Sequence, residues 1–447
     1  MEKLEAKNVI VGFGKAGKTL AKALAVKGES VILIEESKKM YGGTCINIGC
    51  IPSKSLIVNG ERGMDFSDAA VKKTELVGKL NTKNYHNVAD EEFATVVDGR
   101  AKFISNHEIE VSADGAVIYT VTGERIFINT GATPVLPPIP GLAESKNVIT
   151  STELLDLQNL PENLVIIGSG YIGTEFASSF ANYGANVTVL DLSADYLPRE
   201  DDDVSARVKA DLESDGVVFK LGVTIEQIGD DSVTLTTADG NSEILPADKI
   251  LIATGRKPNT AGLGLENTDV TLGARGEVVV NDVLETTAPD VWALGDVHGG
   301  LQFTYTSLDD FRIVMSQLYG DGSRRLSDRT NVPNSVFITP TLSSVGLNEK
   351  AAKAAGVDYR LFKLEATAIP KSAVLSQPKG LLKALVATDG TILGATLYAE
   401  ESHEVINLVS LAIQARLPYT MLRDQVFTHP TMSEALNDLF ADANEVK

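Results

Sequence analysis

Two stretches of the chain repeat one pattern of strand, glycine-rich turn, helix and strand. Residues 8–35 read NVIVGFGKAGKTLAKALAVKGESVILIE, and residues 164–191 read LVIIGSGYIGTEFASSFANYGANVTVLD. In each stretch an apolar strand enters a G-x-G-x-x-G turn, an amphipathic helix follows, and a second apolar strand ends in a carboxylate. A lone glycine turn is weak evidence, but the complete unit predicts two nucleotide-binding α/β units with parallel strands.

The glycines of the two turns perform a task that larger residues cannot. They permit a tight turn, let the backbone approach a pyrophosphate and allow the helix to pack against the strand. The helix that follows offers free N–H groups and the positive end of its dipole to phosphates. The predicted turn glycines are Gly12, Gly14 and Gly17 in the first unit and Gly168, Gly170 and Gly173 in the second. Two dinucleotide sites on one chain indicate a flavin and a nicotinamide.

The acidic residues that close the two units bear on the choice of nucleotide. Glu35 is expected to accept a hydrogen bond from the first ribose, and Asp191 from the second. Asp191 would also repel a 2′-phosphate. The residues that follow it, LSADYLP, contain no arginine to receive one, and Arg199 comes only later. The charge pattern therefore favours NADH over NADPH.

The overall composition argues against several other classes of protein. The 447 residues carry a formal charge of −20, which would repel nucleic acids and anionic membranes, so we expect neither as a partner. No apolar run approaches the roughly 20 residues of a membrane span, and the first residues lack the apolar core of an export signal. We therefore expect a cytoplasmic protein.

The only two cysteines, Cys45 and Cys50, lie five residues apart in GGTCINIGCIPSK, residues 42–54. A disulfide across so short a loop stabilises a fold little through chain entropy. In an ideal helix the two Cα atoms would be about 8.6 Å apart, beyond the reach of a disulfide. The pair can close only if the backbone bends, with Cys45 just ahead of a helix and Cys50 inside it. In a reducing compartment such a pair indicates a catalytic disulfide.

The cysteine stretch and the two glycine units, taken with three further motifs, resemble the flavoprotein disulfide reductases along essentially the whole chain. The further motifs are INTGATP at 128–134, IATGRKP at 252–258 and WALGDV at 292–297. The resemblance implies an α/β fold with two Rossmann-like dinucleotide-binding domains and a C-terminal α+β dimerisation domain. The implied boundaries are 1–150 with 275–329 for the FAD domain, 151–274 for the NAD(P) domain and 330–447 for the dimerisation domain.

The resemblance also implies roles for individual residues. Cys50 would lie against the flavin as a thiolate, Cys45 would be the interchange thiol that meets the substrate, and Lys54 would lie near the flavin with Glu175 as its partner. The other residues implied to bind FAD are Thr44, Ala101, through its backbone, Gly131 and Asp296, and Gly255 is implied to bind the nicotinamide nucleotide.

The C-terminal stretch FTHPTMSEALNDLF, residues 427–440, contains His429 and Glu434. In the family, such a His–Glu pair serves the active site of the other subunit, so the resemblance implies a homodimer with shared sites. The chemistry suits the pair, because an imidazole can take or return the proton of a nucleophilic thiol. Glu434 would orient the ring and stabilise its charged form.

Three stretches resemble one group within the family, the bacterial reactive-chlorine-resistance flavoproteins, whose relatives include hypothiocyanous acid reductases. They are KNYHNVAD at 83–90, FTYTSLDDFRIV at 303–314 and RLPYTMLRDQVFTHPTMSEALNDLF at 416–440. Lipoamide dehydrogenases usually carry H-x-H-P, where this chain has Phe427. Mercuric reductases and large thioredoxin reductases relay electrons to a second cysteine pair, which the sequence lacks. Glutathione reductases usually carry an arginine-rich site for the NADPH phosphate, and such a site is missing from this sequence.

We therefore predict an NADH-dependent FAD enzyme that reduces a small oxidant such as hypothiocyanous acid, with hypochlorous acid or Cu(II) as variants. Dihydrolipoamide dehydrogenase is the alternative within the family, and a redox-sensing interaction protein is the alternative outside it. His86 could ligate copper, but a single histidine more often caps a helix or packs against a neighbour. With five histidines and no Cys–His cluster, no metal site is predicted.

Overall fold

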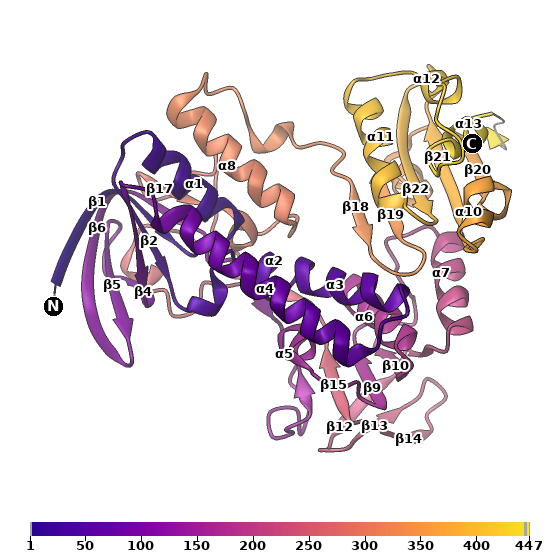
Figure 1. The fold of residues 1–447 in the computed structure, drawn as a ribbon, viewed down its shortest axis with the longest axis horizontal. Helices are drawn as coiled ribbons and strands as arrows, with labels where there is room; N and C mark the ends of the chain where they lie inside the picture. The colour runs from indigo at the N-terminus through magenta and orange to yellow at the C-terminus, as the bar shows by residue number, and fades with distance from the viewer. Residues whose placement is uncertain (1, 442–444, 447) are drawn as a thin grey trace.

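The computed structural model describes residues 2–441 and 445–446. Three sheets form the centres of three lobes (Figure 1), with the start of the chain on the left, its middle at the bottom and its C-terminal part at the upper right. In the described ranges no helix combines the length and the apolar character needed to cross a membrane.

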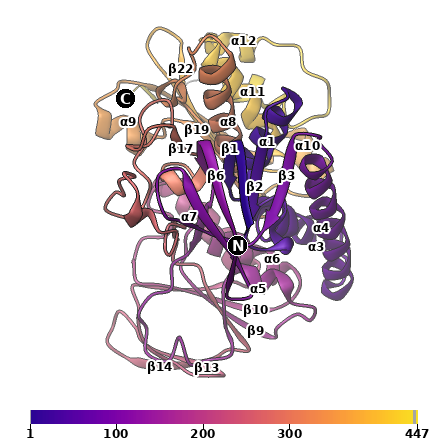
Figure 2. The same ribbon diagram turned by 90° about the vertical axis from the view of Figure 1, so that its left-hand side faces the viewer.

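The first lobe is built on a seven-stranded sheet of order β3-β2-β1-β6-β5-β4, with β17 also paired to β6. Its strands are β1 (Glu2–Val11), β2 (Val31–Glu35), β3 (Ala94–Asp98), β4 (Arg100–Phe103), β5 (Glu108–Ala113), β6 (Ala116–Ile128) and β17 (Val291–Ala293). Figure 2 shows β3, β2, β1 and β6 side by side, and these strands and β17 pair in parallel. The β4–β5–β6 part is antiparallel. The sheet thus joins two distant segments of the chain.

Several helices of the first lobe pack beside this sheet, and two of them carry the cysteines. They are α1 (Lys15–Val26), α2 (Thr44–Asn47), α3 (Cys50–Glu61), α4 (Phe66–Ala89) and α8 (Thr304–Tyr319), with short 3-10 turns at Lys38–Met40, Leu265–Asn267, Gly295–His298 and Leu326–Asp328. The inner face of α1 buries Leu20, Ala21 and Leu24 against the sheet. Helix α3 packs against both α4 and α6 of the second lobe, so it spans the junction of two lobes.

The second lobe is built on a parallel sheet of order β11-β10-β9-β15-β8. Its strands are β8 (Val148–Ile149), β9 (Asn163–Ile167), β10 (Asn186–Asp191), β11 (Val218–Leu221) and β15 (Lys249–Ile252), and its helices are α5 (Ser151–Asp156), α6 (Tyr171–Asn182) and α7 (Asp202–Ser214). An antiparallel three-stranded sheet covers it, with β12 (Thr224–Ile228), β13 (Ser232–Thr236) and β14 (Ser242–Pro246). The pair β7 (Ala132–Pro134) and β16 (Arg256–Pro258) lies where the chain passes between the two lobes.

The third lobe is an antiparallel sheet of order β18-β19-β22-β21-β20-β23 with helices. Its strands are β18 (Asn334–Val336), β19 (Leu342–Gly346), β20 (Arg360–Glu365), β21 (Leu381–Val386), β22 (Ile392–Tyr398) and β23 (Glu445–Val446). Its helices are α9 (Glu349–Ala355), α10 (Pro370–Val374), α11 (Ser402–Gln414), α12 (Tyr419–Arg423) and α13 (Ala435–Leu439), with a 3-10 turn at Ala366–Ala368. The predicted fold class is confirmed. We keep the predicted domain boundaries as a proposal, which the membership of the three sheets supports.

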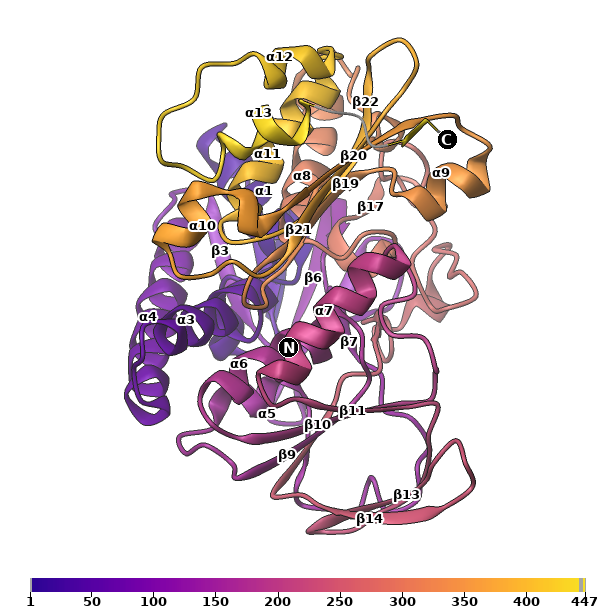
Figure 3. The ribbon, with the colours of Figure 1, turned by 90° about the vertical axis from the view of Figure 1, so that its right-hand side faces the viewer.

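A buried ion-pair cluster joins the second lobe to the third. Lys383 of β21 is 1% exposed, and its Nζ lies 2.6 Å from Asp201, 2.8 Å from Asp203 and 2.8 Å from Glu349. Burial alone would lower the pKa of Lys383, but the hydrogen bonds to these carboxylates raise it above its usual value. Figure 3 shows α7, which follows Asp201, running between the second lobe and β21. In the described chain these carboxylates are the only cluster of metal-ligand type, and an ammonium already neutralises it.

Candidate active site

The two cysteines lie on a bent segment at the surface of the first lobe. Cys45 is the second residue of the short helix α2, and Cys50 is the first residue of α3. Between them the chain leaves helical geometry at Ile48 and Gly49, whose φ angles are −139° and −140°. The expected bend is therefore present. Cys45 lies in a short helix of its own, whereas we predicted that it would precede a single helix.

Gly43 brings this segment onto the first glycine turn. Its φ is +76°, which favours glycine, and a Cβ at this position would lie 2.7 Å from the Cα atom of Gly14. The cysteine segment and the turn expected to hold a pyrophosphate are thus in direct backbone contact. The sequence predicted both motifs but not that they touch.

The two thiols lie close together and differ in acidity. The hydrogen bond from Cys45 lowers the pKa of Cys50 to about 6, and the nearby Lys54 ammonium adds to this effect against the cost of burial. Cys50 also begins α3, where the helix dipole favours a negative charge. For Cys45, the hydrogen bond and the charge of Cys50, together with burial, raise the pKa. Both residues are free thiols in the structure, with Cys50 as the better anion.

Lys54 and Glu175 form the expected pair. The Lys54 Nζ atom lies 2.7 Å from Oε2 of Glu175, which is on α6 of the second lobe. The third lobe completes the arrangement, because the backbone N–H of Phe337 donates to Oε1 of Glu175 at 2.8 Å. The Lys54 ammonium lies 4.6 Å from the centre of the Phe337 ring. All three lobes therefore meet at this pair, one helical turn beyond Cys50.

The residues of the first glycine turn fit the phosphate and ribose of a dinucleotide. Gly12 has a φ of +105°, and a Cβ there would lie 2.3 Å from the carbonyl oxygen of Asn129. Glu35 lies over this turn and accepts hydrogen bonds from the N–H groups of Phe13 at 2.9 Å and Ser37 at 3.1 Å. Burial raises the pKa of Glu35 despite these bonds. The turn is thus packed too closely for side chains, and glycines there let the backbone approach a bound pyrophosphate.

Asn129 ties three motifs together around this cradle. Its Oδ1 accepts from the N–H of Gly17 at 2.8 Å, and its Nδ2 donates to the carbonyl of Leu294 at 2.7 Å. Leu294 directly precedes the turn that carries Asp296, whose pKa is raised by burial and lowered in part by Arg256. The buried Asp310 accepts from the N–H of Gly295 at 2.7 Å and so fixes the same turn.

The remaining residues expected to contact FAD occupy three places. Thr44 begins α2 beside the cysteines, and Gly131 has a φ of +72° in the connection after β6. Ala101 is buried in β4, at the antiparallel end of the sheet. A contact with FAD remains a proposal for all three.

The second glycine unit repeats the geometry of the first. Gly168 has a φ of +112°, and a Cβ there would lie 2.5 Å from the carbonyl oxygen of Ala253. Asp191 accepts from the N–H and the hydroxyl of Ser169, both at 2.7 Å. Gly255, at φ +114°, lies just beyond β15. With Gly170, which directly precedes α6, and Gly173 in its first turn, these residues fit a second dinucleotide.

His429 and Glu434 are paired in the third lobe. His429 Nδ1 lies 2.8 Å from Oε2 of Glu434, whose other oxygen accepts from the N–H of Thr431 at 3.2 Å. The hydrogen bond from His429 lowers the pKa of Glu434. The His429 side chain is 69% exposed, and among the described residues no hydrogen bond joins it to either cysteine. Exposed apolar side chains of Leu411, Met421 and Val426 lie on the same lobe.

His86 lies on α4 and pairs with Asp90 one turn later, at 3.0 Å from Nδ1 to Oδ1. Its side chain is 56% exposed. The choice between a packing residue and a copper ligand stays a prediction for His86.

Two residues of the site were not predicted from the sequence. Thr304, the first residue of α8, places its hydroxyl 3.8 Å from the Cys50 sulfur. Phe337 covers Lys54, as described above. Both lie more than 250 residues from the cysteines, and the only sequence signal was that Thr304 belongs to the FTYTSLDDFRIV stretch.

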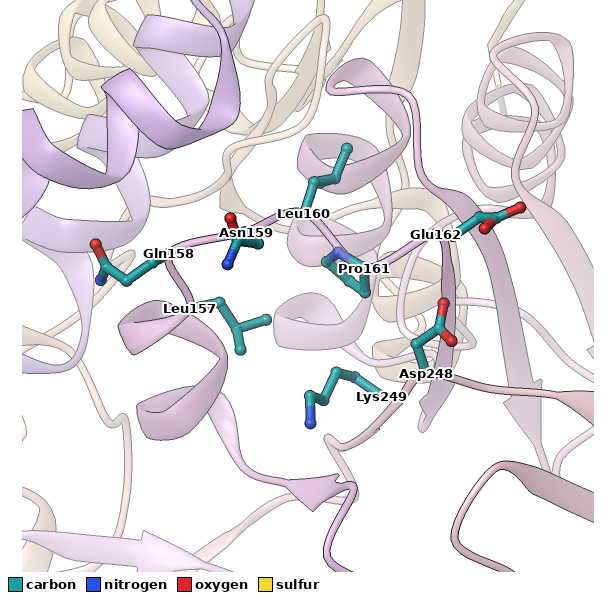
Figure 4. Close-up of a pocket in the computed structure, with 8 residues that line it drawn as sticks. All are labelled: Leu157, Gln158, Asn159, Leu160, Pro161, Glu162, Asp248 and Lys249. Carbon is teal, nitrogen blue, oxygen red and sulfur yellow. The ribbon is translucent and has the colours of Figure 1, made fainter.

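A surface hollow of about 360 Å³ lies elsewhere, between the end of α5 and the start of β15 (Figure 4). Its lining residues are Leu157, Gln158, Asn159, Leu160, Pro161, Glu162, Asp248 and Lys249. It shares no residue with the cysteine segment or the glycine turns.

Comparisons with known proteins agree with this geometry. The family model described as pyridine nucleotide-disulphide oxidoreductase matches residues 6–310, and the model of its dimerisation domain matches residues 332–440. The chain is 49% identical to the probable pyridine nucleotide-disulfide oxidoreductase RclA of Escherichia coli (strain K12), over 97% of this chain and 98% of that protein. It is 33% identical to a mercuric reductase of Staphylococcus aureus, over 96% of this chain and 80% of the relative.

A solved structure is similar along the whole fold. The Cu(II) complex of the HOCl-induced flavoprotein disulfide reductase RclA from Escherichia coli matches with a TM-score of 0.95 and 48% identity, over 98% of this chain and 99% of that one. The match to the dimerisation-domain model supports a homodimer. Together, the two family models account for nearly the whole chain. The protein therefore belongs to the pyridine nucleotide-disulphide oxidoreductase family.

Proposed function

We propose that the protein is an NADH-dependent FAD oxidoreductase that uses a redox-active Cys45–Cys50 disulfide to reduce a small oxidant, with hypothiocyanous acid as the first candidate. The observation that carries the proposal is the placement of two thiols on one bent segment, in backbone contact with the first glycine turn. Cys50 is acidic, with a pKa of about 6, and Cys45 retains its proton. Membership of the family implies FAD and a pyridine nucleotide as cofactors.

The chain's own residues would hold both cofactors. The first glycine turn, Glu35, Thr44, Ala101, Gly131 and Asp296 would bind FAD, and the second glycine turn, Asp191 and Gly255 would bind NADH. Bound FAD would supply the disulfide with two electrons taken from NADH. Lys54, fixed by Glu175 and Phe337, would keep a positive charge beside Cys50.

The two sulfurs and a histidine would carry out the reduction of the oxidant. The Cys45 sulfur passes its proton to His429 of the partner subunit and attacks the sulfur of hypothiocyanous acid, so an S–S bond forms and the S–O bond breaks. The departing hydroxide takes the proton from the partner's His429 and becomes water. The Cys50 thiolate then attacks the Cys45 sulfur, thiocyanate leaves and the disulfide re-forms. The net change converts NADH and HOSCN to NAD⁺, SCN⁻ and water.

The similarity to RclA supports a small inorganic oxidant. That relative is described as HOCl-induced, and its structure is a Cu(II) complex. Hypochlorous acid and Cu(II) are therefore further substrates to test here. Dihydrolipoamide dehydrogenase remains the alternative, although Phe427 packs against the core of the third lobe where lipoamide dehydrogenases usually carry a second histidine. A redox-sensing interaction protein is the other alternative. We also propose a reducing, cytoplasmic compartment, which a catalytic disulfide of this kind needs.

The deciding experiment compares substrates on the FAD-loaded dimer. We expect NADH oxidation with hypothiocyanite to continue for many turnovers without any added protein, and to exceed the rate with lipoamide. Turnover with lipoamide alone would replace the proposal by dihydrolipoamide dehydrogenase. A single turnover that stops until another protein is added would favour a sensor.

The same assay tests the nicotinamide. Both oxygens of Asp191 accept hydrogen bonds from backbone N–H groups, at 2.7 Å from Ser169 and 2.8 Å from Ser193, so the carboxylate is held in place. A carboxylate held there repels a 2′-phosphate. We expect a higher kcat/KM for NADH than for NADPH, and the opposite order would overturn this part of the proposal.

A further inference from the structure

A lysine lies against the turn that carries Cys45, and none of the roles described above uses it. Lys18 is on α1, one turn beyond the start of the helix, and is half-buried. Its Nζ donates to the carbonyl oxygen of Gly42 at 3.3 Å and to Oδ1 of Asn84. Gly42 precedes Cys45 by three residues. The ammonium therefore lies between the cysteine turn and helix α4.

Asn84 holds the ammonium in a defined position. It is 9% exposed, and its Nδ2 donates to the carbonyl of Leu80 at 2.7 Å, which turns its oxygen toward Lys18. A Cβ on Gly42 would lie 3.2 Å from the Asn84 side chain, so the helix and the cysteine turn are in contact. Asn84 belongs to the KNYHNVAD stretch. The residue of that stretch that reaches the cysteine turn is thus Asn84, whereas His86 pairs with Asp90 on the exposed side.

The charge of Lys18 is not cancelled by a carboxylate. Both of its hydrogen-bond partners are neutral oxygens, and in the described ranges no ion pair involves it. Burial, and the neighbouring Lys15, lower the pKa of Lys18 to about 8. In turn, Lys18 lowers the pKa of Cys45 against the larger effects of Cys50 and burial. The ammonium is therefore the main form at pH 7, and it is held at the turn that carries Cys45.

We propose that Lys18, held by Gly42 and Asn84, is a positioning residue for Cys45 that favours small anions, such as hypothiocyanite and departing thiocyanate, at this sulfur. The part concerning these anions rests on the function proposed above. When Cys50 attacks the Cys45 sulfur, one S–S bond forms, the bond to the SCN group breaks and thiocyanate leaves with the electron pair. A fixed ammonium at the turn that carries Cys45 stabilises the leaving anion.

Alkylation of the enzyme measures this charge without any oxidant. FAD-loaded protein, reduced by NADH without oxygen, is treated at pH 7 with anionic iodoacetate or neutral iodoacetamide, and fragment-ion mass spectrometry follows the adduct on Cys45. We expect Lys18→Gln to lower the ratio of the iodoacetate rate to the iodoacetamide rate by about fivefold, because one nearby unit charge is lost. Lys18→Arg should keep the ratio.

Two further variants separate charge from structure. Lys22→Gln removes an ammonium from the same helix, where Lys22 pairs with Glu91 at 3.0 Å, and should leave the ratio unchanged. Asn84→Asp keeps Lys18 but places a carboxylate against it, and should lower the ratio as Lys18→Gln does. If Lys18→Gln fails to retain FAD, Asn84→Asp still tests whether the charge of Lys18 acts at Cys45.

The outcomes distinguish the two proposals. Equal loss of both alkylation rates in Lys18→Gln, or an unchanged ratio in either charge variant, would overturn the role of Lys18. If the ratio falls as expected but hypothiocyanite is not turned over, the charge at Cys45 stands and the proposed substrate fails.

Discussion

The Nζ atom of Lys54 lies 2.7 Å from Oε2 of Glu175, and this pair joins the helix that begins at Cys50 to the helix that begins at the second glycine turn. Phe337 of the third lobe contacts both members of the pair: its backbone N–H donates to Glu175, and its ring lies against the Lys54 ammonium. One ion pair therefore sets the position of a positive charge beside the acidic thiol. It also fixes the two predicted nucleotide sites relative to each other.

Replacing Lys54 should raise the pKa of Cys50 and so lower the fraction of thiolate at neutral pH. Lys54→Met removes a charge that lowers the pKa of Cys50, so we expect that pKa to rise from about 6 by about one unit. The pH dependence of Cys50 alkylation in the NADH-reduced protein measures the shift. Lys79→Met, an exposed change on α4, is the control. An unchanged alkylation profile in Lys54→Met would show that the ammonium does not support the thiolate.

The two cysteines should differ in their spectra. Cys45→Ser keeps Cys50, its lysine and a hydroxyl donor at position 45, so the FAD-loaded variant should show a thiolate–flavin charge-transfer band but no turnover. Cys50→Ser should lose both. Absorbance spectra at pH 8 check this, and identical spectra for the two variants would mean that the sulfurs have been assigned the wrong way round.

His429 should act across the dimer. His429→Gln is expected to reduce turnover by about 10²- to 10⁴-fold, because the proton acceptor is lost. Mixing that variant with Cys45→Ser and allowing the subunits to exchange should restore about a quarter of the wild-type activity, since half of the dimers are mixed and each has one intact site. If both residues act within one chain, the mixture stays inactive.

The sequence predicted those features that depend on local pattern. The two glycine units, their terminal acids and the bend between Cys45 and Cys50 all follow from residues close together in the chain. The Lys54–Glu175 pair came from the resemblance rather than from any spacing in the sequence. What the sequence could not give are contacts between distant segments, since nothing near Thr304 or Phe337 indicates that they lie at Cys50 and Lys54.

The sequence also could not predict which polar side chains form buried hydrogen bonds. Asn129 connects three motifs because it is buried among free backbone groups, which the sequence alone does not reveal. In the same way, the sequence places Lys18 on an amphipathic helix but does not indicate that it donates to Asn84 of α4. The antiparallel β4–β5–β6 part of the first sheet was also not predicted, although the sequence carries a hairpin signal there. Asp114 and Gly115, with φ of +50° and +80°, form the two-residue turn between β5 and β6.

Glu400 should make stability depend on pH. Burial, with Glu61 and Glu401 nearby, raises its pKa from 4.5 to about 7. Between these two values the folded protein retains a proton that the unfolded chain has lost, so stability falls as the pH rises through this window. Glu400→Gln removes the effect and should raise Tm by about 1–3 °C at pH 8, with little change near pH 4.5. Thermal unfolding at both pH values tests this. An equal shift at both would point to a cause other than ionisation.

The claim that electrons reach the Cys45–Cys50 disulfide can be tested by counting thiols. FAD-loaded protein receives one equivalent of NADH without oxygen and is then denatured in an alkylating reagent, with or without prior addition of one equivalent of hypothiocyanite. We predict that NADH makes Cys45 and Cys50 both available for labelling and that hypothiocyanite abolishes the labelling of both. Labelling that is the same before and after NADH, while the flavin is reduced, would contradict the account.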